Sequence, residues 1–318
     1  MATSGSYSFA VTRDDIIRQA MLNIRRLDPD TSPLAQETND CARVLNMMCK
    51  QWMGKSDFAP GLKVWTRKTG HLLLSPTTGV YTINSTANGW TNTLVQTTTT
   101  AGAAVGAGSV TVASTAGLSA TMNVGIRLDS GAIFYTTILS VVGSVVNLVA
   151  TLTGASASGN PVFAYTAAAQ APLHVEAAVL RDNTNNDTPL KFLTVQSYAY
   201  LPNKADVTNI GDPTAVLYEA GINTGTLSTD VGAALDTTKQ IVLTYLEPVQ
   251  DFVNPLDTPY YPQEWYLALC WGLSEQICPM FGANWTQKME GLKTTALTIA
   301  RNKGAEVSSL FFQPGAED

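Results

Sequence analysis

The sequence has few charged side chains and almost no histidine. Asp, Glu, Lys and Arg make up 14% of its 318 residues, against about 25% in an average globular domain, and it contains 2 histidines. The 4 cysteines form no CxxC pair, so no zinc site is expected. All 4 cysteines fall in segments with helical periodicity, which indicates reduced cysteines that pack in the core of a cytosolic chain.

Long apolar runs are also lacking. No stretch reaches the roughly 18 apolar residues that a membrane-spanning helix needs, so no membrane span is expected. Residues 1–10 contain no basic start followed by an apolar run, so no secretory signal is expected. Hydrophobic residues still make up 45% of the chain, which is enough for a sizeable core and argues against disorder. The length suggests about two domains.

The net charge of −6 is distributed unevenly. Residues 1–83 carry 10 basic and 7 acidic side chains, whereas residues 84–170 carry one of each. Residues 171–318 carry 8 basic and 17 acidic side chains, and ten of these acids lie between Asp206 and Glu275 with a single base. Because affinity for phosphate comes from Lys and Arg, the acidic stretch is expected to repel DNA.

Two helices are predicted at each end of the chain. The first spans residues 12–27 and begins with a capping box formed by Thr12 and Asp15. The second begins at Ser32-Pro33, with the serine as N-cap and the proline in the first helical position. Near the other end a third helix precedes the last one, which Asn284 is expected to cap. Apolar residues recur along all four at helical spacing, so the helices most simply pack as one bundle.

The segments between the helices have the periodicity of β structure. Residues 72–83 are predicted to form a hairpin that turns at Pro76–Gly79. Residues 84–170 contain short β-like runs separated by turn signals, which indicates a small antiparallel barrel or sandwich inserted into the host domain. A disordered low-complexity linker is the alternative. The β-like runs are Ser109–Val112, Val124–Leu128, Ile133–Ile138, Val145–Thr151 and Pro161–Tyr165.

The expected fold class is therefore α+β. A helical bundle from the N- and C-terminal helices would join antiparallel β structure, with the all-β module looped out of it. In this scheme residues 1–83 and 171–306 form the host domain, residues 84–170 form the inserted module, and residues 307–318 form a docking tail.

No catalytic constellation stands out in the sequence. His71 and His174 have no Cys, Ser or carboxylate neighbour at a suggestive spacing. The glycine-rich run at residues 102–108 lacks the Lys-Ser/Thr of a phosphate loop. Acidic residues around a proline loop could pair as glycosidase carboxylates do, although a solvated acidic loop is more common; they are Asp251, Asp257 and Glu264. The chain is therefore predicted not to be an enzyme and to have no catalytic residue, cofactor or metal site.

The run Leu310-Phe311-Phe312 is unusual for a segment so close to a chain end. Terminal residues are normally polar and loosely held, yet three large apolar residues stand here before Pro314-Gly315 and an acidic pair. Such residues require a surface to dock on. That surface could be the chain's own body, or a neighbouring subunit or partner.

Several passages together resemble the head-to-tail adaptor (connector) proteins of short-tailed bacteriophages, the group that includes tail tubular protein A and the packaged-DNA stabilisation protein. The passages cover most of residues 10–83 and 171–303, and the stretch Pro262–Tyr266 is the most specific. They are Thr12–Ile17 with Leu45–Trp52, Thr188–Leu193 with Tyr198–Lys204, Gly211–Thr214 leading to Tyr218, and Leu243–Phe252 through Tyr261–Leu269.

The resemblance implies a structural virion protein at the head–tail interface, present in the host cytoplasm during assembly. Such adaptors form a homo-oligomeric ring, usually a dodecamer, that joins the portal protein to the tail nozzle protein and surrounds the channel through which double-stranded DNA leaves. The inserted module would project outward, where a tail fibre or the capsid could meet it. Rings of this kind need a heterologous interface that closes by rotation.

Three groups of residues are candidates for such a role. Leu310, Phe311 and Phe312 would dock on the portal or on a neighbouring subunit, and Asp251 and Asp257 would line the channel and repel phosphate. The last helix is basic and could contact the portal or the packaged DNA end through Lys288, Lys293, Arg301 and Lys303. Two other functions stay open: a β-rich surface or glycan-binding module, and a tail-associated hydrolase that would use Glu264.

Overall fold

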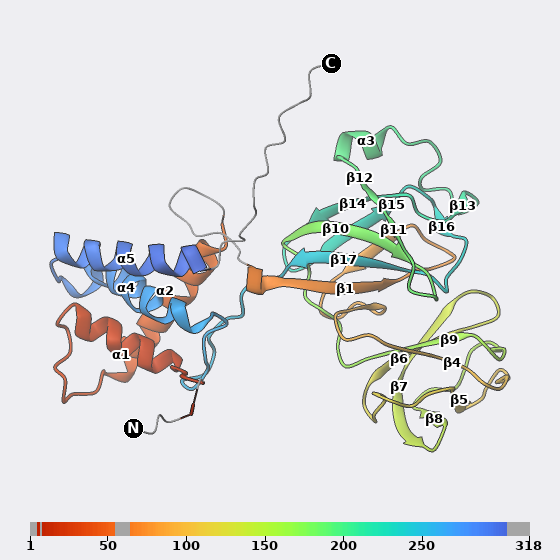
Figure 1. The fold of residues 1–318 in the computed structure, drawn as a ribbon, viewed down its shortest axis with the longest axis horizontal. Coiled ribbons are helices and arrows are strands. Elements are labelled where there is room, and N and C mark those ends of the chain that lie inside the picture. The colour runs from red at the N-terminus through yellow and green to blue at the C-terminus, as the bar shows by residue number, and fades with distance from the viewer. Residues whose placement is uncertain (1–4, 7, 55–63, 304–318) are drawn as a thin grey trace. The chain divides into compact units, whose positions relative to one another are not determined.

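A computed structural model describes residues 5–6, 8–54 and 64–303, and the chain divides into two compact units. One unit is drawn from Met1–Thr66 and Pro248–Asp318, and the other is Arg67–Glu247. Helices dominate the first and antiparallel sheets the second (Figure 1). The α+β fold class is therefore confirmed.

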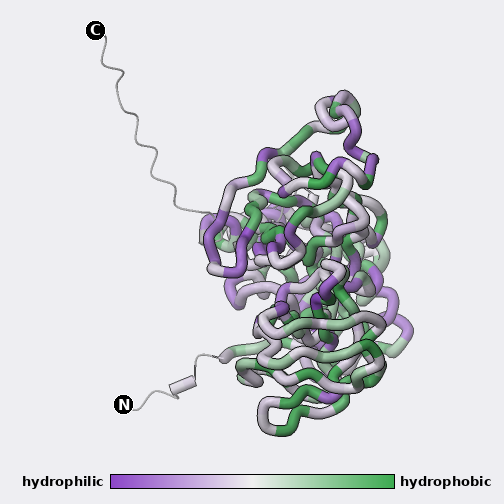
Figure 2. Tube along the Cα trace, turned by 90° about the vertical axis from the view of Figure 1, so that its right-hand side faces the viewer, coloured by the Kyte–Doolittle hydropathy of each residue, from purple (hydrophilic) through white to green (hydrophobic). Residues whose placement is uncertain are grey.

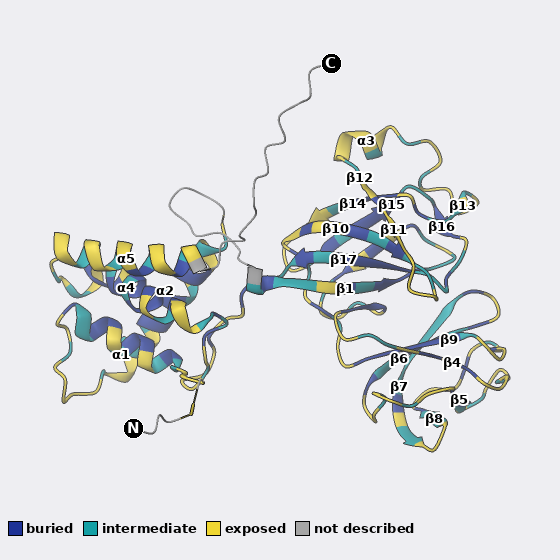
Figure 3. Cartoon of the chain, viewed as in Figure 1, coloured by how far each residue is buried: buried dark blue, intermediate teal, exposed yellow. Residues whose placement is uncertain are grey.

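Four helices of the first unit share one hydrophobic core. Helix α4 contacts α1, α2 and α5, and the core contains the fully buried side chains of Ile16, Leu45, Leu269 and Ala300. Figure 3 shows buried inner faces on these helices and an exposed outer face along α5. The helical elements are α1 (Arg13–Asn23), α2 (Ala35–Trp52), α4 (Tyr266–Ile277) and α5 (Gln287–Lys303), with the short 3-10 turns η1 (Val64–Thr66), η2 (Gln263–Trp265) and η3 (Pro279–Phe281).

The helix ends agree with the sequence patterns only in part. The capping box of Thr12 and Asp15 is present and starts α1. Two other predicted caps are wrong: Leu34, not Ser32, precedes α2, and the hydroxyl of Thr286, not Asn284, accepts from the Met289 N–H at the start of α5. Helix α1 also ends four residues earlier than residue 27.

Two sheets of the second unit enclose a common core. Leu72 and Leu243 from one sheet, and Tyr81 and Val216 from the other, belong to this buried cluster. The five-stranded sheet has the order β11-β10-β17-β1-β3, and the four-stranded sheet the order β12-β14-β15-β2. Their strands are β1 (Arg67–Leu73), β2 (Val80–Ile83), β3 (Trp90–Thr91), β10 (His174–Arg181), β11 (Asp187–Pro189), β12 (Lys191–Phe192), β14 (Ala215–Ala220), β15 (Gly225–Thr229) and β17 (Gln240–Leu246). A short helix, α3 (Val195–Ala199), and a two-stranded sheet of β13 (Ile210–Gly211) and β16 (Ala233–Ala234) complete this part.

The hairpin predicted for residues 72–83 is wrong. A tight turn does form, with a bridge between Ser75 and Thr78. The flanking strands, however, belong to different sheets, because β1 pairs with β17 and β3 whereas β2 pairs with β15. Pairing with strands far along the chain therefore replaces the local pairing.

The chain between β3 and β10 forms a six-stranded antiparallel sheet. It has the order β4-β9-β6-β7-β8-β5, and its own apolar cluster includes Val124, Ile126 and Val162, all fully buried. The two edge strands approach each other, because just after β4 the Thr100 N–H donates to the carbonyl of Thr111 in β5 at 2.9 Å. The sheet therefore curls. Its strands are β4 (Val95–Thr98), β5 (Ser109–Thr111), β6 (Asn123–Arg127), β7 (Ile133–Val142), β8 (Val145–Leu148) and β9 (Pro161–Tyr165).

Polar bonds connect the six-stranded sheet to the rest of its unit. The hydroxyl of Thr237, just before β17, accepts from Arg127 Nε at 2.9 Å and donates to the Gly131 carbonyl at 2.6 Å. The Gly89 N–H donates to the Tyr165 hydroxyl at 3.2 Å. Figure 2 shows hydrophobic and hydrophilic residues interspersed along the chain rather than gathered in long apolar runs. Among the described residues, no helix combines the length and apolarity that crossing a membrane requires.

Candidate functional site

The basic helix predicted near the end of the chain is α5, but its cations differ in availability. Lys293 Nζ lies 2.6 Å from Glu275 Oε1 and 3.1 Å from Glu290 Oε1. Burial lowers the pKa of Lys293, yet the hydrogen bonds to the two glutamates raise it overall. Arg301 is half-buried, whereas Lys288 is exposed. Lys303 is the last residue of α5. The two glutamates thus neutralise the ammonium of Lys293 within the fold. The last helix therefore has fewer unpaired cations than its sequence indicates.

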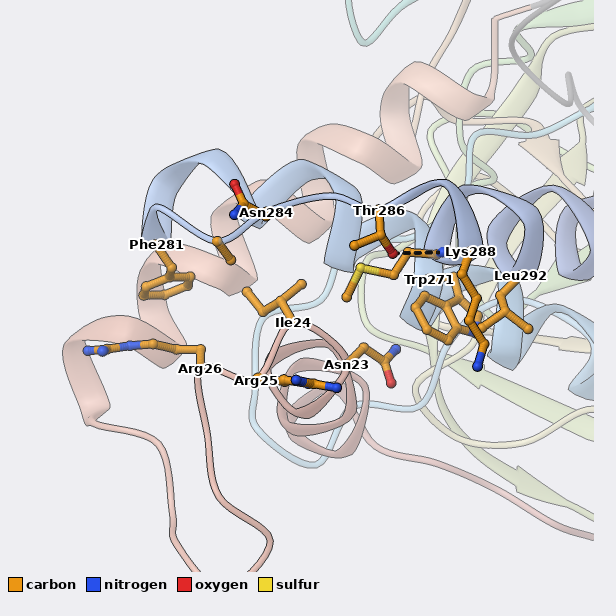
Figure 4. A pocket seen from close by; sticks show the side chains of 12 residues that line it. Asn23, Ile24, Arg25, Arg26, Trp271, Phe281, Asn284, Thr286, Lys288 and Leu292 are labelled. Atoms are coloured by element: carbon orange, nitrogen blue, oxygen red, sulfur yellow. Dashed lines mark hydrogen bonds between the residues drawn. The ribbon is translucent and has the colours of Figure 1, made fainter.

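A cleft of about 650 Å³ lies between the end of α1 and the start of α5 (Figure 4). Helix α1 stops here because Arg25 adopts a left-handed backbone conformation, with φ of 58°. An arginine in this conformation is uncommon and reverses the chain direction sharply. The walls combine apolar and cationic side chains: Asn23, Ile24, Arg25, Arg26, Trp271, Phe281, Ala283, Asn284, Thr286, Lys288, Met289 and Leu292.

The three cations of the cleft have different environments. Arg26 forms an ion pair with Glu37 and lies over the Phe281 ring, with Cζ 5.3 Å from the ring centroid. Arg25 and Lys288 are exposed, and neither forms a salt bridge with a carboxylate of the described residues. The cleft therefore carries net positive charge beside an aromatic wall, a combination that favours an anionic and partly apolar ligand.

The two predicted channel residues lie together on a small hollow of about 250 Å³ in the loop after β17. Asp257 accepts the N–H groups of Asn254 at 2.6 Å and Val253 at 2.7 Å. These two backbone bonds lower the pKa of Asp257. Asp251 pairs with Lys50 Nζ at 2.6 Å. Each carboxylate thus has a structural role in the loop, while Glu264 does not line the hollow.

The same loop is hydrogen-bonded to the start of α1. The Asp257 carbonyl accepts the Arg13 N–H at 2.8 Å, and Arg13 Nη1 donates to the Val253 carbonyl at 3.1 Å. The loop and the start of α1 are therefore one structural element. Substitution of Asp257 would therefore disturb the structure of the helical unit and would also remove a negative charge from any channel.

The cysteines are buried in the cores and His71 is half-buried. All four cysteines are free and buried, and burial raises the pKa of Cys49 and of Cys270 to about 12. The Nδ1 atom of His71 lies 3.1 Å from Gln240 Oε1, and burial lowers the pKa of this histidine. Within the described ranges, no three His, Cys, Asp or Glu side chains are grouped as metal ligands would be.

The sequence patterns did not identify the cleft. Its residues come from the end of α1 and, more than 240 positions later, from α4, η3 and the start of α5, and no periodicity relates them. The only local signals were the pair Arg25-Arg26 at the end of a predicted helix and Lys288 in the last helix. The run Leu310-Phe311-Phe312, predicted as a docking segment, lies outside the described residues. The chain matches no protein-family model, and no curated protein matches it.

Proposed function

We propose that this chain is a ring-forming head-to-tail adaptor of a short-tailed bacteriophage, a structural virion protein without catalytic activity. In this role copies of the chain, twelve in the usual arrangement, join the portal to the tail nozzle and surround the passage for double-stranded DNA. The segment Leu310–Phe312 docks on the portal or on a neighbouring subunit, and a tail fibre is a further partner.

The sequence resemblance at Pro262–Tyr266 carries this proposal. In the structure Pro262 precedes the turn η2 (Gln263–Trp265), and Tyr266 begins α4. Trp265 is 2% exposed, and its ring lies 6.0 Å from Trp52, 5.2 Å from Trp65 and 5.7 Å from Tyr261 between centroids. The most specific part of the resemblance thus coincides with the aromatic centre of the helical core. This supports a likeness in fold, because residues at such a centre determine how the helices pack.

The surface chemistry of the six-stranded sheet supports protein contacts over nucleic-acid contacts. Its two charged residues are both engaged: Arg127 donates to Thr237, and Asp129 Oδ1 accepts the Ala157 N–H at 2.7 Å. Leu139 and Val142 on β7 remain 61% and 65% exposed. An uncharged face with exposed apolar side chains suits a protein partner such as a tail fibre or the capsid. Its single cation, Arg127, donates to Thr237 and Asn160, and one cation gives little affinity for a phosphate backbone.

Native mass spectrometry of the chain, alone and mixed with a portal ring, tests the proposal. We expect a 33.9 kDa monomer that adds to the portal in a number that matches the ring. If the chain binds to none of the portal rings tested, including that of the phage that encodes it, this result would contradict the adaptor role. Binding to a glycan array under the same conditions would instead favour the glycan-binding alternative, and glycan cleavage that depends on Glu264 would favour the hydrolase.

A further inference from the structure

The cleft between α1 and α5 combines exposed apolar surface with positive charge that no described carboxylate pairs. Trp271, Leu292 and Lys288 lie toward one end, while Phe281 and Arg26 lie toward the other, with Arg25 between them (Figure 4). The large apolar side chain of Leu292 remains 43% exposed. One of these cations, Lys288, thus lies beside the Trp271–Leu292 surface, and a second, Arg25, lies farther along the cleft.

The segment that follows α5 carries groups that complement the cleft. Leu310-Phe311-Phe312 comes first, then four residues that include Pro314-Gly315, and then Glu317-Asp318. No Lys or Arg occurs after Lys303. Arg25 and Lys288 are the two cleft cations that no described carboxylate neutralises, and the segment supplies two carboxylates.

We propose that residues 310–318 of this chain occupy the cleft, with Leu310–Phe312 against Trp271 and Leu292 and with the acidic pair beside Arg25. The binding would combine burial of aromatic surface with charge pairing at Arg25. This inference does not rest on the proposed head–tail role. It assigns a ligand site that would serve equally in an isolated copy and between neighbouring copies.

The chain is long enough for this contact even within one copy. Leu292 lies eleven residues before Lys303, about 16 Å along a helix at 1.5 Å per residue. The seven steps from Lys303 to Leu310 span up to about 23 Å when extended. A segment that runs back along α5 therefore reaches the Trp271–Leu292 surface of the cleft first. Its acidic pair would then lie farther along the cleft, toward Arg25.

Site-specific photo-crosslinking in the full-length chain tests the proposal. With benzoylphenylalanine in place of Phe311, ultraviolet irradiation and peptide mass spectrometry should identify crosslinks to Trp271, Met289 or Leu292. Adducts of monomer mass would place the segment in its own copy's cleft, and adducts of dimer mass would place it in that of a neighbour; both support the proposal. Crosslinks confined to other surfaces, or no crosslink at all, would overturn it.

Substitutions in the cleft separate specific docking from chance proximity. Leu292→Asp and Arg25→Asn should each lower the crosslink yield about fivefold, as expected when a central contact is lost; asparagine tolerates the left-handed backbone at position 25. Met47→Asp is the matched control, since Met47 is 58% exposed on α2 and does not line the cleft. An equal loss in the control variant would argue against the cleft.

An exchange of charges between the cleft and the segment gives a second test. It compares two variants with each other, so it does not depend on the stability of one variant. Arg25→Asp, which introduces a residue that tolerates the left-handed backbone at this position, should lower the yield, and adding Glu317→Lys with Asp318→Lys to this variant should restore most of it. Failure of the exchange to restore crosslinking, together with unchanged yield in Arg25→Asn, would show that charge pairing does not hold the segment there.

Discussion

At the start of α1 two side chains satisfy each other's backbone groups. Thr12 Oγ1 accepts the Asp15 N–H at 3.2 Å, and Asp15 Oδ2 accepts the Thr12 N–H at 2.9 Å. The backbone hydrogen bond from Thr12 is the main reason why the pKa of Asp15 is lowered. A carboxylate with a lowered pKa in the folded state stabilises the protein above its unfolded pKa, near 4. That contribution disappears as pH falls through the lowered folded value.

We therefore expect Thr12→Ala to destabilise the helical unit by about 1 kcal/mol at pH 7. Asp15→Asn should remove part of the stability loss that the native chain shows between neutral and acidic pH. Urea unfolding followed by tryptophan fluorescence at pH 7 and pH 3 measures both effects. Asp30→Asn, at an exposed loop position, is the control and should leave the pH dependence unchanged; an equal change there would contradict the capping argument.

The residue-scale features that sequence predicted correctly are local ones. The Thr12–Asp15 box depends on two side chains three positions apart, so its pattern is complete in the sequence. Ser32 and Asn284 are equally good cap residues by type, yet Leu34 and Thr286 occupy those helix ends. Leu34 makes no side-chain cap hydrogen bond, so a good cap residue nearby did not determine where α2 begins.

At the scale of elements, strand β1 depends on a close contact with a buried tryptophan. A Cβ atom added at Gly70 would lie 2.1 Å from Trp90 Cη2. The tryptophan is fully buried, lies 5.4 Å from the Tyr245 ring, and donates from Nε1 to the Gln170 carbonyl at 3.2 Å. Because the ring is fully buried and these two neighbours hold it, it has little freedom to move away from a larger residue at position 70.

Gly70→Ala should destabilise the β unit by about 1–3 kcal/mol, the usual cost of overpacking a well-packed core. Hydrogen exchange of peptides from β1, β3 and β17 measures this effect directly. Gly108→Ala provides the matched control in the same unit, since a Cβ there meets nothing within 4 Å. If both variants exchange alike, the close contact between β1 and Trp90 has no energetic weight.

Some strands could be predicted from the sequence and others could not. Strands β5 to β9 fall on the predicted runs, and their turns contain Gly131, Gly143 and Gly159 with positive φ, because strand period and turn glycines are local signals. The hairpin at Pro76–Gly79 had the same kind of local signal and was wrong. Its strand β1 pairs instead with β17, about 170 residues away, and no local pattern encodes such a partner.

At the scale of the whole molecule, sequence predicted the class of fold but not the assembly of the candidate site. Alternating and helical periods correctly indicated helices at both ends and β structure between them. The cleft, however, forms only when the end of α1 meets the start of α5. Its chemistry depends on the left-handed turn at Arg25 and on the side-by-side packing of α1, α4 and α5, which a single sequence does not reveal.

The two units have separate cores, and this leads to a prediction for the whole chain. The buried cluster of the helical unit contains no residue between Thr66 and Pro248, and the two clusters of the β unit lie entirely within Arg67–Glu247. Leu45→Ala should therefore lower the opening free energy of helical-unit peptides by about 2–5 kcal/mol, the usual range for a buried leucine. Peptides from the β unit should keep theirs.

Ile126→Ala, in the six-stranded sheet, is the reciprocal variant, because Ile126 and Leu45 are both fully buried. It should accelerate exchange in the β unit and leave the helical unit unchanged. Tryptophan fluorescence gives an independent check, since five of the six tryptophans, all except Trp90, belong to the helical unit. Equal shifts of both units in both variants would mean that the chain unfolds as one cooperative body. Selective shifts would show that each unit is stabilised by its own core, so that substitutions in one can be tested without unfolding the other.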